Sequence, residues 1–393
     1  MSAAANRQAI RHGERGERLA LDAAIWIPAL FLAAFGVVMV ASSSVAIAER
    51  AGVAPFSFVA RHLMFLACGA GLGAAFYFAG SQALERVSRP LALLAVLLLL
   101  LPLLPGIGVE INGARRWINL GLLRFQVVEA VKLLLIVTIA GYLARQRASV
   151  RGSFWVTLKP LLLGAVLAAL LLKQPDMGSA LVLLSIAGGM VLLAGAPWRH
   201  LLLPALGSLP LLTMAALEPY RWARLTTFVA PEKDPTGDGY QLLQALIAVG
   251  RGELFGVGLG ASIQKLFYLP EAHNDFIFAV VAEELGLAGV VAVLAAFAVL
   301  VGRILLSGLA AERLARPFSA FVLYGIGLWL GLQVLISSGV NLGVLPTTGL
   351  TLPLISTGGS SMVMVTAALG LALRLRREID DERLAVPRRR VWA

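Results

Sequence analysis

The stretch that decides the fold runs from residue 262 to 286, Ser-Ile-Gln-Lys-Leu-Phe-Tyr-Leu-Pro-Glu-Ala-His-Asn-Asp-Phe-Ile-Phe-Ala-Val-Val-Ala-Glu-Glu-Leu-Gly. It closes the only long polar segment of the chain and continues directly into an apolar helix. Asp275 therefore lies at a membrane boundary, close in sequence to Lys265, Glu271 and His273. A carboxylate at such a boundary is costly unless it has a partner or a function.

The composition around this stretch is that of a membrane protein. Of the 393 residues, 59% are hydrophobic and 14% charged, and the mean hydropathy is +0.85. A soluble domain could not bury so much apolar surface. The single cysteine, Cys68, excludes a disulfide framework. Residues 1–19 are polar and rich in arginine, unlike a secretory leader, so we expect the first apolar run to remain as a signal anchor.

Hydropathy predicts an all-α polytopic membrane protein, because a spanning helix needs about 20 apolar residues. The ten candidate segments are 24–46, 58–79, 88–104, 126–144, 158–173, 177–195, 201–218, 275–302, 318–340 and 358–375. The expected organisation is a cytoplasmic tail (1–23), a transmembrane domain (24–376) and a basic cytoplasmic tail (377–393).

The distribution of positive charge predicts the orientation. If both termini are cytoplasmic and all ten segments cross, 21 of the 33 Lys and Arg residues fall on the cytoplasmic side. Basic loops beside an anionic leaflet account for the net charge of +11, so no nucleic-acid partner is implied. The run Arg388–Arg390 fits a topology anchor.

Three polar segments then face outward: 105–125, 219–274 and 341–357. The second, about 55 residues long, exceeds what a connector needs, and we expect a folded cap with a short amphipathic helix at 240–250. The glycines at 256–260 lack a surrounding βαβ unit, which argues against a dinucleotide site. The four histidines are scattered, so no tightly bound metal is indicated.

Six cations in the outward segments suggest an anionic ligand such as a lipid phosphate, although any one alone would fit interfacial anchoring. They are Arg115, Arg116, Arg221, Arg224, Arg251 and Lys265. Two charges lie deeper, Glu129 and Lys132, three residues apart on one helix face. They are either a self-contained pair or a group in which Lys132 also meets Asp275. Glu283 and Glu284 are assigned to helix packing.

The chain resembles the SEDS family (shape, elongation, division and sporulation proteins), and its division branch in particular. The matching stretches are Gly113-Ala-Arg-Arg-Trp117, Phe125-Gln126 with Glu129 and Lys132, Lys173-Gln-Pro-Asp-Met-Gly-Ser179, Glu218-Pro-Tyr-Arg221, Asp238-Gly-Tyr-Gln241, Gly250-Arg-Gly-Glu253, Gln264 to Gly286, and Gly349-Leu-Thr-Leu-Pro-Leu-Ile-Ser-Thr-Gly-Gly-Ser-Ser361. The sequence departs from the family pattern at three places. Val127-Val128 stands where the family usually has Pro-Ser, Thr348 where it usually has Lys, and Thr357 where it usually has Tyr.

The resemblance implies ten transmembrane helices and polymerisation of lipid II into peptidoglycan glycan strands at the division septum of the inner membrane. It implies a class B penicillin-binding transpeptidase and other divisome membrane proteins as partners. The essential aspartate of the family falls on Asp275 and its buried lysine on Lys132, with Glu129 in support. The expected substrate site adds Glu271, His273 and Ser360 to the outer cations. Mg²⁺ or Mn²⁺ would act only as a transient partner of the lipid diphosphate.

From the residues, Asp275 fits the general base of an inverting glycosyl transfer, and the cations fit stabilisation of the departing diphosphate. A competing structural role for Asp275 is the N-cap of the helix that follows it. Two other functions stay open: a lipid II flippase, in which the intramembrane charges line a headgroup path, and a non-catalytic division scaffold. No inverted repeat supports the flippase.

Overall fold

The computed structural model describes residues 22–385, apart from 112, 120, 122–123, 219–221, 223–225, 230 and 232–238. Each of the ten predicted apolar segments forms a helix. The bounds are α2 Ala23–Arg50, α3 Ser57–Val87, α4 Pro90–Leu100 with the 3₁₀ turn η1 Leu101–Leu103, α5 Val127–Arg145, α6 Phe154–Lys173, α7 Met177–Leu193, α8 Arg199–Ala216, α11 Ile277–Arg313, α12 Pro317–Asn341 and α13 Gly359–Ala385. The predicted amphipathic helix is α10, Tyr240–Gly252.

Helix length and composition confirm the polytopic membrane fold. Among the described residues, six helices are long and apolar enough to cross a membrane, namely α2, α3, α5, α6, α11 and α12. The helical stretch Pro90–Leu103 and α7 are apolar but shorter. Ten crossings therefore stay a prediction. Helix α13 continues to Ala385 without a break at position 376, where the transmembrane domain was predicted to end.

The segment predicted only as an outward polar connection contains a small sheet. Strands β1 (Gly108–Ile111), β2 (Ala114–Asn119) and β3 (Arg124–Gln126) pair in that order, antiparallel throughout. Trp117 lies opposite Val109 on one side and Gln126 on the other. The sheet leads directly into α5, so it fixes the chain at the start of the helix that carries Glu129 and Lys132.

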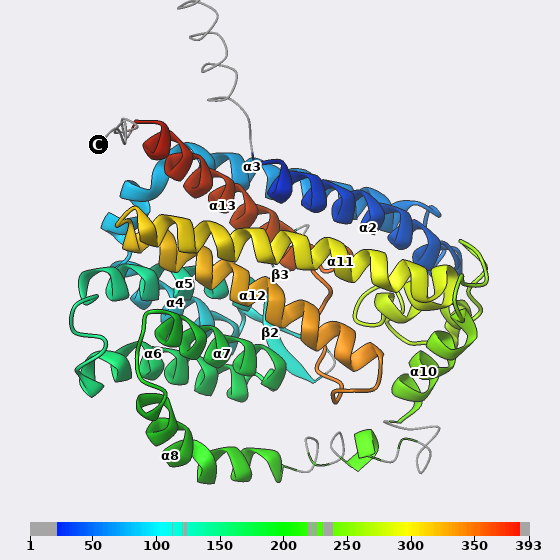
Figure 1. Ribbon diagram of the computed structural model, residues 1–393. Coiled ribbons are helices and arrows are strands. Elements are labelled where there is room, and N and C mark those ends of the chain that lie inside the picture. The colour runs from blue at the N-terminus through cyan, green and yellow to red at the C-terminus, as the bar shows by residue number, and fades with distance from the viewer. Residues whose placement is uncertain are drawn as a thin grey trace, which may run out of the picture.

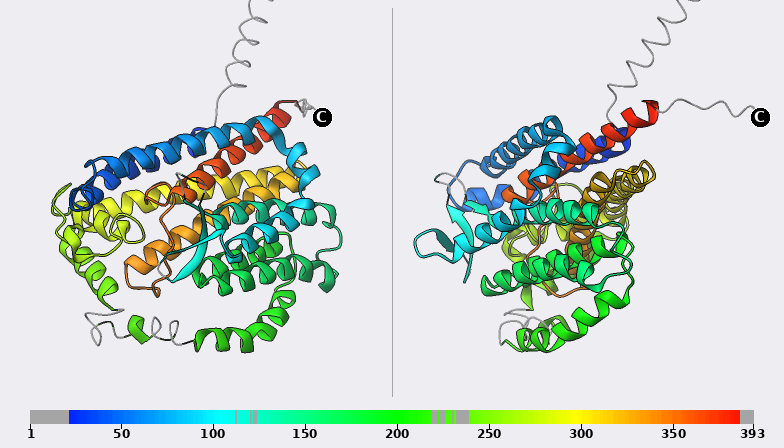
Figure 2. Two further views of the ribbon diagram at one scale, coloured as in Figure 1. Left: turned by 180° about the vertical axis from the view of Figure 1, so that it is seen from behind. Right: turned by 90° about the vertical axis from the view of Figure 1, so that its left-hand side faces the viewer.

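The helices form a bundle with two distinct ends (Figures 1 and 2). In Figure 1 the turn between α11 and α12 and the end of α13 lie on the left, and α10 lies on the right.

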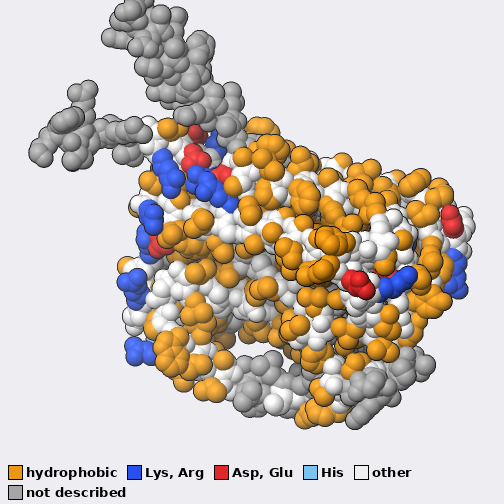
Figure 3. Space-filling view, turned by 45° about the vertical axis from the view of Figure 1, so that its right-hand side comes forward, with side chains coloured by type: hydrophobic (Ala, Val, Ile, Leu, Met, Phe, Trp, Pro, Cys, Tyr) orange, Lys and Arg blue, Asp and Glu red, His pale blue; other side chains and the backbone are white. Residues whose placement is uncertain are grey.

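Helices α3 and α13 cross closely because both have glycines at the contact: a Cβ at Gly370 would lie 2.3 Å from the carbonyl oxygen of Gly73. Hydrophobic side chains cover much of the face in Figure 3, as expected for a surface in contact with lipid.

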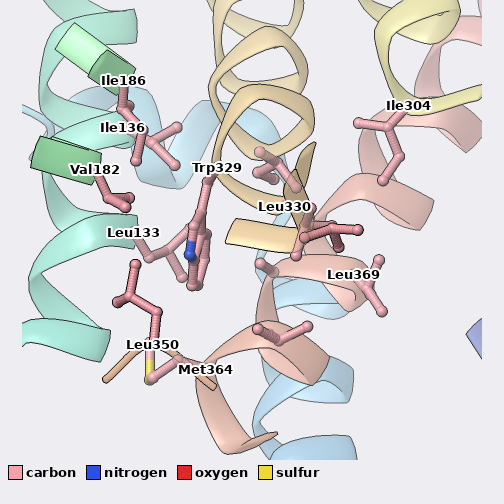
Figure 4. Packing of buried hydrophobic residues seen from close by; sticks show 14 of the residues in the cluster. Leu133, Ile136, Val182, Ile186, Ile304, Trp329, Leu330, Leu350, Met364 and Leu369 are labelled. Carbon is pink, nitrogen blue, oxygen red and sulfur yellow. The ribbon is translucent and has the colours of Figure 1, made fainter. Parts of the chain in front are cut away.

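The centre of the bundle is built around α12. Its Trp329 is fully buried. Figure 4 shows the indole among side chains from α5 (Leu133, Ile136), α7 (Val182, Ile186) and the C-terminal part of the chain (Leu350, Met364). This core holds α5, α7, α12 and α13 together around the polar groups described below.

Helix α11 is broken at Gly286, where φ is +64° and ψ is −164°. The break frees carbonyl and amide groups, which hydrogen-bond to the segment after α10 instead. The four bonds are Val257 N to Glu283 O (2.9 Å), Gly258 N to Glu284 O (3.0 Å), Leu287 N to Glu253 O (2.9 Å) and Ala288 N to Leu254 O (3.1 Å). A Cβ at Gly256 would lie 2.1 Å from the carbonyl oxygen of Glu284, so the close approach requires glycine.

Candidate active site

Asp275 is half-buried and comes just before α11. The capping position of that helix is occupied by Phe276 rather than by Asp275. The side chain of Asn341, at the end of α12, accepts a hydrogen bond from the Ala279 amide (3.0 Å) and donates one to the Asp275 carbonyl (2.9 Å). The N-cap role that competed with catalysis is therefore filled by other residues, and the helix start is fixed by α12.

The turn that carries Asp275 is tied to the segment between α12 and α13. Ser356 Oγ donates to the Asn274 carbonyl (2.7 Å), and Thr357 Oγ1 donates to the His273 carbonyl (2.9 Å). A Cβ at Gly349 would lie 3.6 Å from Asp275 Oδ2, so the carboxylate lies beside Gly349. Gly349 has φ of +72°, a conformation that other residues rarely adopt.

Lys132 is fully buried in the centre of the bundle. Its ammonium donates to Glu129 Oε1 (2.7 Å) and Gln333 Oε1 (3.0 Å) and lies 5.2 Å from the centre of the Trp329 ring. Gln333 Nε2 in turn donates to the Thr351 carbonyl (2.9 Å). Lys132 is thus connected through Gln333 to the segment that contacts the Asp275 turn.

The Glu129–Lys132 pair predicted from helical spacing is present, with 2.7 Å between Lys132 Nζ and Glu129 Oε1. A direct contact between Lys132 and Asp275 stays a prediction. Glu129 Oε2 is buried and has no hydrogen-bond partner among the described residues, so the pair keeps one free acceptor.

Arg116 lies on β2 close to a second buried carboxylate. Its Nη1 is 3.6 Å from Asp176 Oδ2, and its Nε is buried without a hydrogen-bond partner among the described residues. Asp176 caps α7 by accepting from the Ser179 amide (3.0 Å). Gln126 Nε2 also approaches Asp176 Oδ2 (3.4 Å), and the Gln126 amide donates to Ser360 Oγ (2.8 Å). The predicted residue Ser360 therefore positions the start of α5.

Asp176 is adjacent to the Asp275 turn through one close packing contact. A Cβ at Gly178, in the first turn of α7, would lie 2.9 Å from the carbonyl oxygen of Thr348. Thr348 precedes Gly349, which lies beside Asp275. The described structure thus gathers Asp275, Thr348 and the Arg116–Asp176 pair around one segment, 348–361. Sequence reasoning assigned no role to Asp176 or Gln333, although Asp176 stands inside a quoted motif.

Two of the predicted phosphate-binding cations are already neutralised. Arg251 Nη1 lies 3.0 Å from Glu283, and Lys265 Nζ lies 2.7 Å from Glu284; both glutamates are fully buried. Glu283 also accepts from the Ser262 hydroxyl and from two backbone amides. Assigning the two glutamates to helix packing understated their role, because they hold the outer loop on α11.

The remaining predicted residues lie at the rim of the site or outside it. Arg115 is exposed and pairs with Glu110 (2.9 Å). Glu271 is exposed at the tip of the turn. Arg221 and Arg224 lie outside the described residues. Burial lowers the pKa of His273, a shift that the nearby Glu271 carboxylate opposes, so the imidazole is neutral at pH 7. A neutral His273 can hydrogen-bond a sugar but adds no charge for a diphosphate.

Polar atoms without partners gather beside Asp275. Among the described residues, His273 Nδ1, Asn274 Oδ1 and Thr348 Oγ1 are buried and form no hydrogen bond. Buried polar atoms are normally satisfied, so such a group marks a place where a polar ligand would bind. The same described residues contain no group of three His, Cys, Asp or Glu side chains that could hold a metal ion.

Known proteins resemble the chain over nearly its whole length. The family described as "Cell cycle protein" (FtsW, RodA and SpoVE) matches residues 22–380. A relative from Xanthomonas oryzae pv. oryzae, "Probable peptidoglycan glycosyltransferase FtsW", is 47% identical over 378 residues, covering 95% of this chain and 76% of the relative. A relative of the same name from Nitrosococcus halophilus is 50% identical over 358 residues, covering 91% and 92%.

Solved structures are also similar to the chain in fold. A chain from the work "Structural coordination of polymerization and crosslinking by a peptidoglycan synthase complex" superposes with a TM-score of 0.72 at 35% identity, covering 92% of this chain and 99% of that one. The rod shape determining protein RodA of Thermus thermophilus gives a TM-score of 0.67 at 34% identity, covering 92% and 98%. By sequence and by fold, the chain belongs to the Cell cycle protein family of FtsW, RodA and SpoVE.

Proposed function

We propose that this chain is a peptidoglycan glycosyltransferase that polymerises lipid II into β-1,4-linked glycan strands during septal wall synthesis. Relatives that carry this activity in their names cover nearly the whole chain. The observation that carries the proposal is Asp275: a half-buried carboxylate, relieved of a capping role, beside buried polar atoms without partners. Such a group needs a ligand that uses it.

The proposed reaction is one inverting displacement. Asp275 accepts the proton of the acceptor 4-hydroxyl, whose oxygen forms a bond to the anomeric carbon of the donor. The bond from that carbon to the diphosphate oxygen breaks on the opposite face, and the electron pair leaves with the diphosphate. The α-linkage of the donor becomes a β-linkage in the product, and a base so placed contributes about 10²- to 10⁴-fold.

Arg116 is the cation that we assign first to the departing diphosphate. It is only partly neutralised by Asp176 at 3.6 Å, and its Nε is free among the described contacts. Arg251 and Lys265 are less suited, because each is close to a buried glutamate. Mg²⁺ or Mn²⁺, where it contributes, would be bound by the diphosphate itself, a hard oxygen ligand that both ions accept.

Lys132 and Glu129 act as positioning residues in this proposal. Their pair fixes Gln333, and Gln333 fixes Thr351 in the segment that lies against the Asp275 turn. This path gives Lys132 an influence on the segment that lies beside Asp275.

The protein is a multi-pass membrane protein, and we propose that both termini are cytoplasmic and the 219–274 loop is outside. The excess of arginine on the tails and alternate loops supports this orientation. A relative in fold comes from a synthase complex that coordinates polymerisation and crosslinking, which supports a class B transpeptidase as partner. Reporter fusions at Gly237 and Gln146 should report opposite compartments, and the same compartment for both would contradict the orientation.

The decisive experiment is polymerisation of lipid II by the purified protein with its transpeptidase partner. Asp275→Asn keeps the shape and polarity of the side chain, so folding and membrane abundance should survive, but it removes the proton acceptor. We expect synthesis to fall by about 10²-fold or more, with partial activity for Asp275→Glu. Polymerisation by Asp275→Asn at the wild-type rate would exclude Asp275 as base. Wild-type protein that makes no glycan would favour the flippase or the scaffold.

A further inference from the structure

The end of the bundle opposite the candidate active site has a charged pocket that plays no part in the proposed reaction. It lies where α3 ends, α4 begins and α5 ends, and its lining consists of Gln82, Glu85, Arg86, Arg89 and Arg145. Three guanidinium groups thus converge with a single carboxylate. Arg86 and Arg89 are neighbours at the junction of α3 and α4, and folding brings Arg145 to them from the end of α5.

The three arginines of the pocket have no carboxylate partner at ion-pair distance among the described residues, unlike several arginines on α11 and α13. None of Arg86, Arg89 and Arg145 forms an ion pair with any residue that the structure describes. By contrast, several arginines on α11 and α13 are matched to carboxylates. Examples are Arg303 with Asp22 (2.6 Å), Arg374 with Glu378 (2.8 Å) and Arg376 with Asp380 (2.7 Å). The pocket therefore has positive charge that the protein leaves unbalanced.

The position of Arg145 is fixed by a buried hydroxyl. Its Nη1 donates to Ser88 Oγ (3.0 Å), and Ser88 Oγ donates to the Glu85 carbonyl (2.7 Å). Ser88 fits against α5 because of Gly141, where a Cβ would lie 2.2 Å from Ser88 Oγ. One nitrogen of Arg145 is thus anchored, and its other N–H groups remain available to a ligand. Arg145 is exposed, but this hydrogen bond restricts where its guanidinium group lies.

The surroundings of the pocket point to a lipid as the source of the anion. The two helices that meet at the pocket, α3 and α4, also carry exposed apolar side chains: Phe78 is 79% exposed and Leu93 63%. Of the most apolar part of α3, only 17% is buried inside the protein, as expected for a helix whose sides contact lipid. A ligand here would present a phosphate to the arginines and acyl chains to the helix sides.

We propose that Arg86, Arg89 and Arg145 form a specific site for the phosphate of an anionic phospholipid. The inference is independent of the proposed catalytic function. Arginine suits the site because its planar fork can donate two parallel hydrogen bonds to a phosphate. The alternative is general attraction between a basic protein end and anionic lipid, and the two differ in stoichiometry and in sensitivity to single residues.

The test is native mass spectrometry of delipidated full-length protein, titrated with phosphatidylglycerol or phosphatidylcholine in detergent. We expect one phosphatidylglycerol to bind more tightly than the rest, with no such preference for phosphatidylcholine. Arg89→Gln should weaken that first binding step by about tenfold or more, as loss of a charge-assisted contact predicts. Arg89→Lys keeps the charge but not the fork, and should weaken it by a smaller factor.

Arg383→Gln is the matched control, because it removes the same charge from an ion-paired arginine on α13. It should leave the first binding step unchanged. Equal losses for Arg89→Gln and Arg383→Gln would show general charge attraction and overturn the site. So would wild-type binding by Arg89→Gln, or binding of inorganic phosphate as tight as that of the lipid. Because Arg86 and Arg89 are exposed, the variants should keep the wild-type thermal midpoint.

Discussion

Two buried lysines in this protein each lie 2.7 Å from a glutamate, yet they connect different parts of the fold. Lys132 pairs with Glu129 on the same helix, three residues away. Lys265 pairs with Glu284 across a loop and a helix, and also donates to Ser42 on α2 (2.9 Å). The first pair lies in the bundle core and the second at its outer rim.

The two pairs therefore stabilise different parts of the structure. Lys132 hydrogen-bonds to Gln333, and Gln333 hydrogen-bonds to Thr351 in the segment beside Asp275. The Lys265 pair holds the outer loop against α2 and α11, and its hydrogen bonds end there. We infer that Lys132 affects the reaction, whereas Lys265 mainly affects the stability of the loop.

The largest effect should come from the Lys132 pair. Lys132→Met leaves Glu129 as a buried charge without a partner, which should lower the free energy of unfolding by about 3–5 kcal/mol. Polymerisation should fall by about 10²-fold or more, because the segment beside the proposed base Asp275 loses its positioning through Gln333. Thermal unfolding and lipid II polymerisation measure the two effects separately.

The double variant Lys132→Met with Glu129→Gln makes this test sharper. Removing both charges should restore most of the stability, because buried pairs can be replaced by neutral residues of similar volume. Activity should stay low, since the positioning of Gln333 is lost. If the double variant polymerises at the wild-type rate, Lys132 is structural and the two lysines do not differ in kind.

A smaller effect on activity is expected at the outer pair. Lys265→Met with Glu284→Gln should lower the thermal midpoint but leave polymerisation within about tenfold of wild type, because the hydrogen bonds of this pair do not lead to the segment beside Asp275. A well-folded double variant with a raised KM for lipid II would instead return Lys265 to the diphosphate site, where the sequence first placed it.

The smallest effect should come from His273, in the turn that carries Asp275. Burial lowers the pKa of its imidazole from the ordinary value of 6.5, and Glu271 opposes the shift. The neutral ring therefore contributes stability above pH 6.5 that is lost as the pH falls through the lowered value. His273→Gln should remove this part of the pH dependence of the thermal midpoint and change activity only slightly. An inflection in wild-type polymerisation near pH 6.5 that the variant abolishes would show that His273 titrates in the reaction.

Hydropathy was sufficient to predict the helices, because lipid contact imposes long apolar runs that no soluble fold needs. The spacing of three residues was sufficient to predict the pairing of Glu129 with Lys132, since a helix brings side chains at that spacing together. The small sheet was missed because its strands are three to six residues long. One signal was present: Asn112-Gly113 is a dipeptide that favours a two-residue hairpin turn.

The rest of the site depends on contacts between distant segments. The hydrogen bond from Asn341 of α12 to the start of α11 could not be inferred from the sequence, and neither could the link that Gln333 makes between Lys132 and Thr351. In each case the bonded residues lie on different elements. The pairing of Lys265 with Glu284 was hidden for the same reason. No spacing rule predicts that a cation in a loop will pair with a glutamate in a helix.

The break in α11 has a consequence for how the outer loop can change. Residues 253–258 satisfy backbone groups of α11 that the break leaves open. Pulling this segment away would leave those amide and carbonyl groups without their protein partners. The second half of the loop is therefore structurally continuous with α11, although it belongs to the segment predicted to be outside. Protease cleavage or an inserted tag between 219 and 238 should leave residues 253–275 in place, whereas an insertion at 256 should prevent the bundle from assembling.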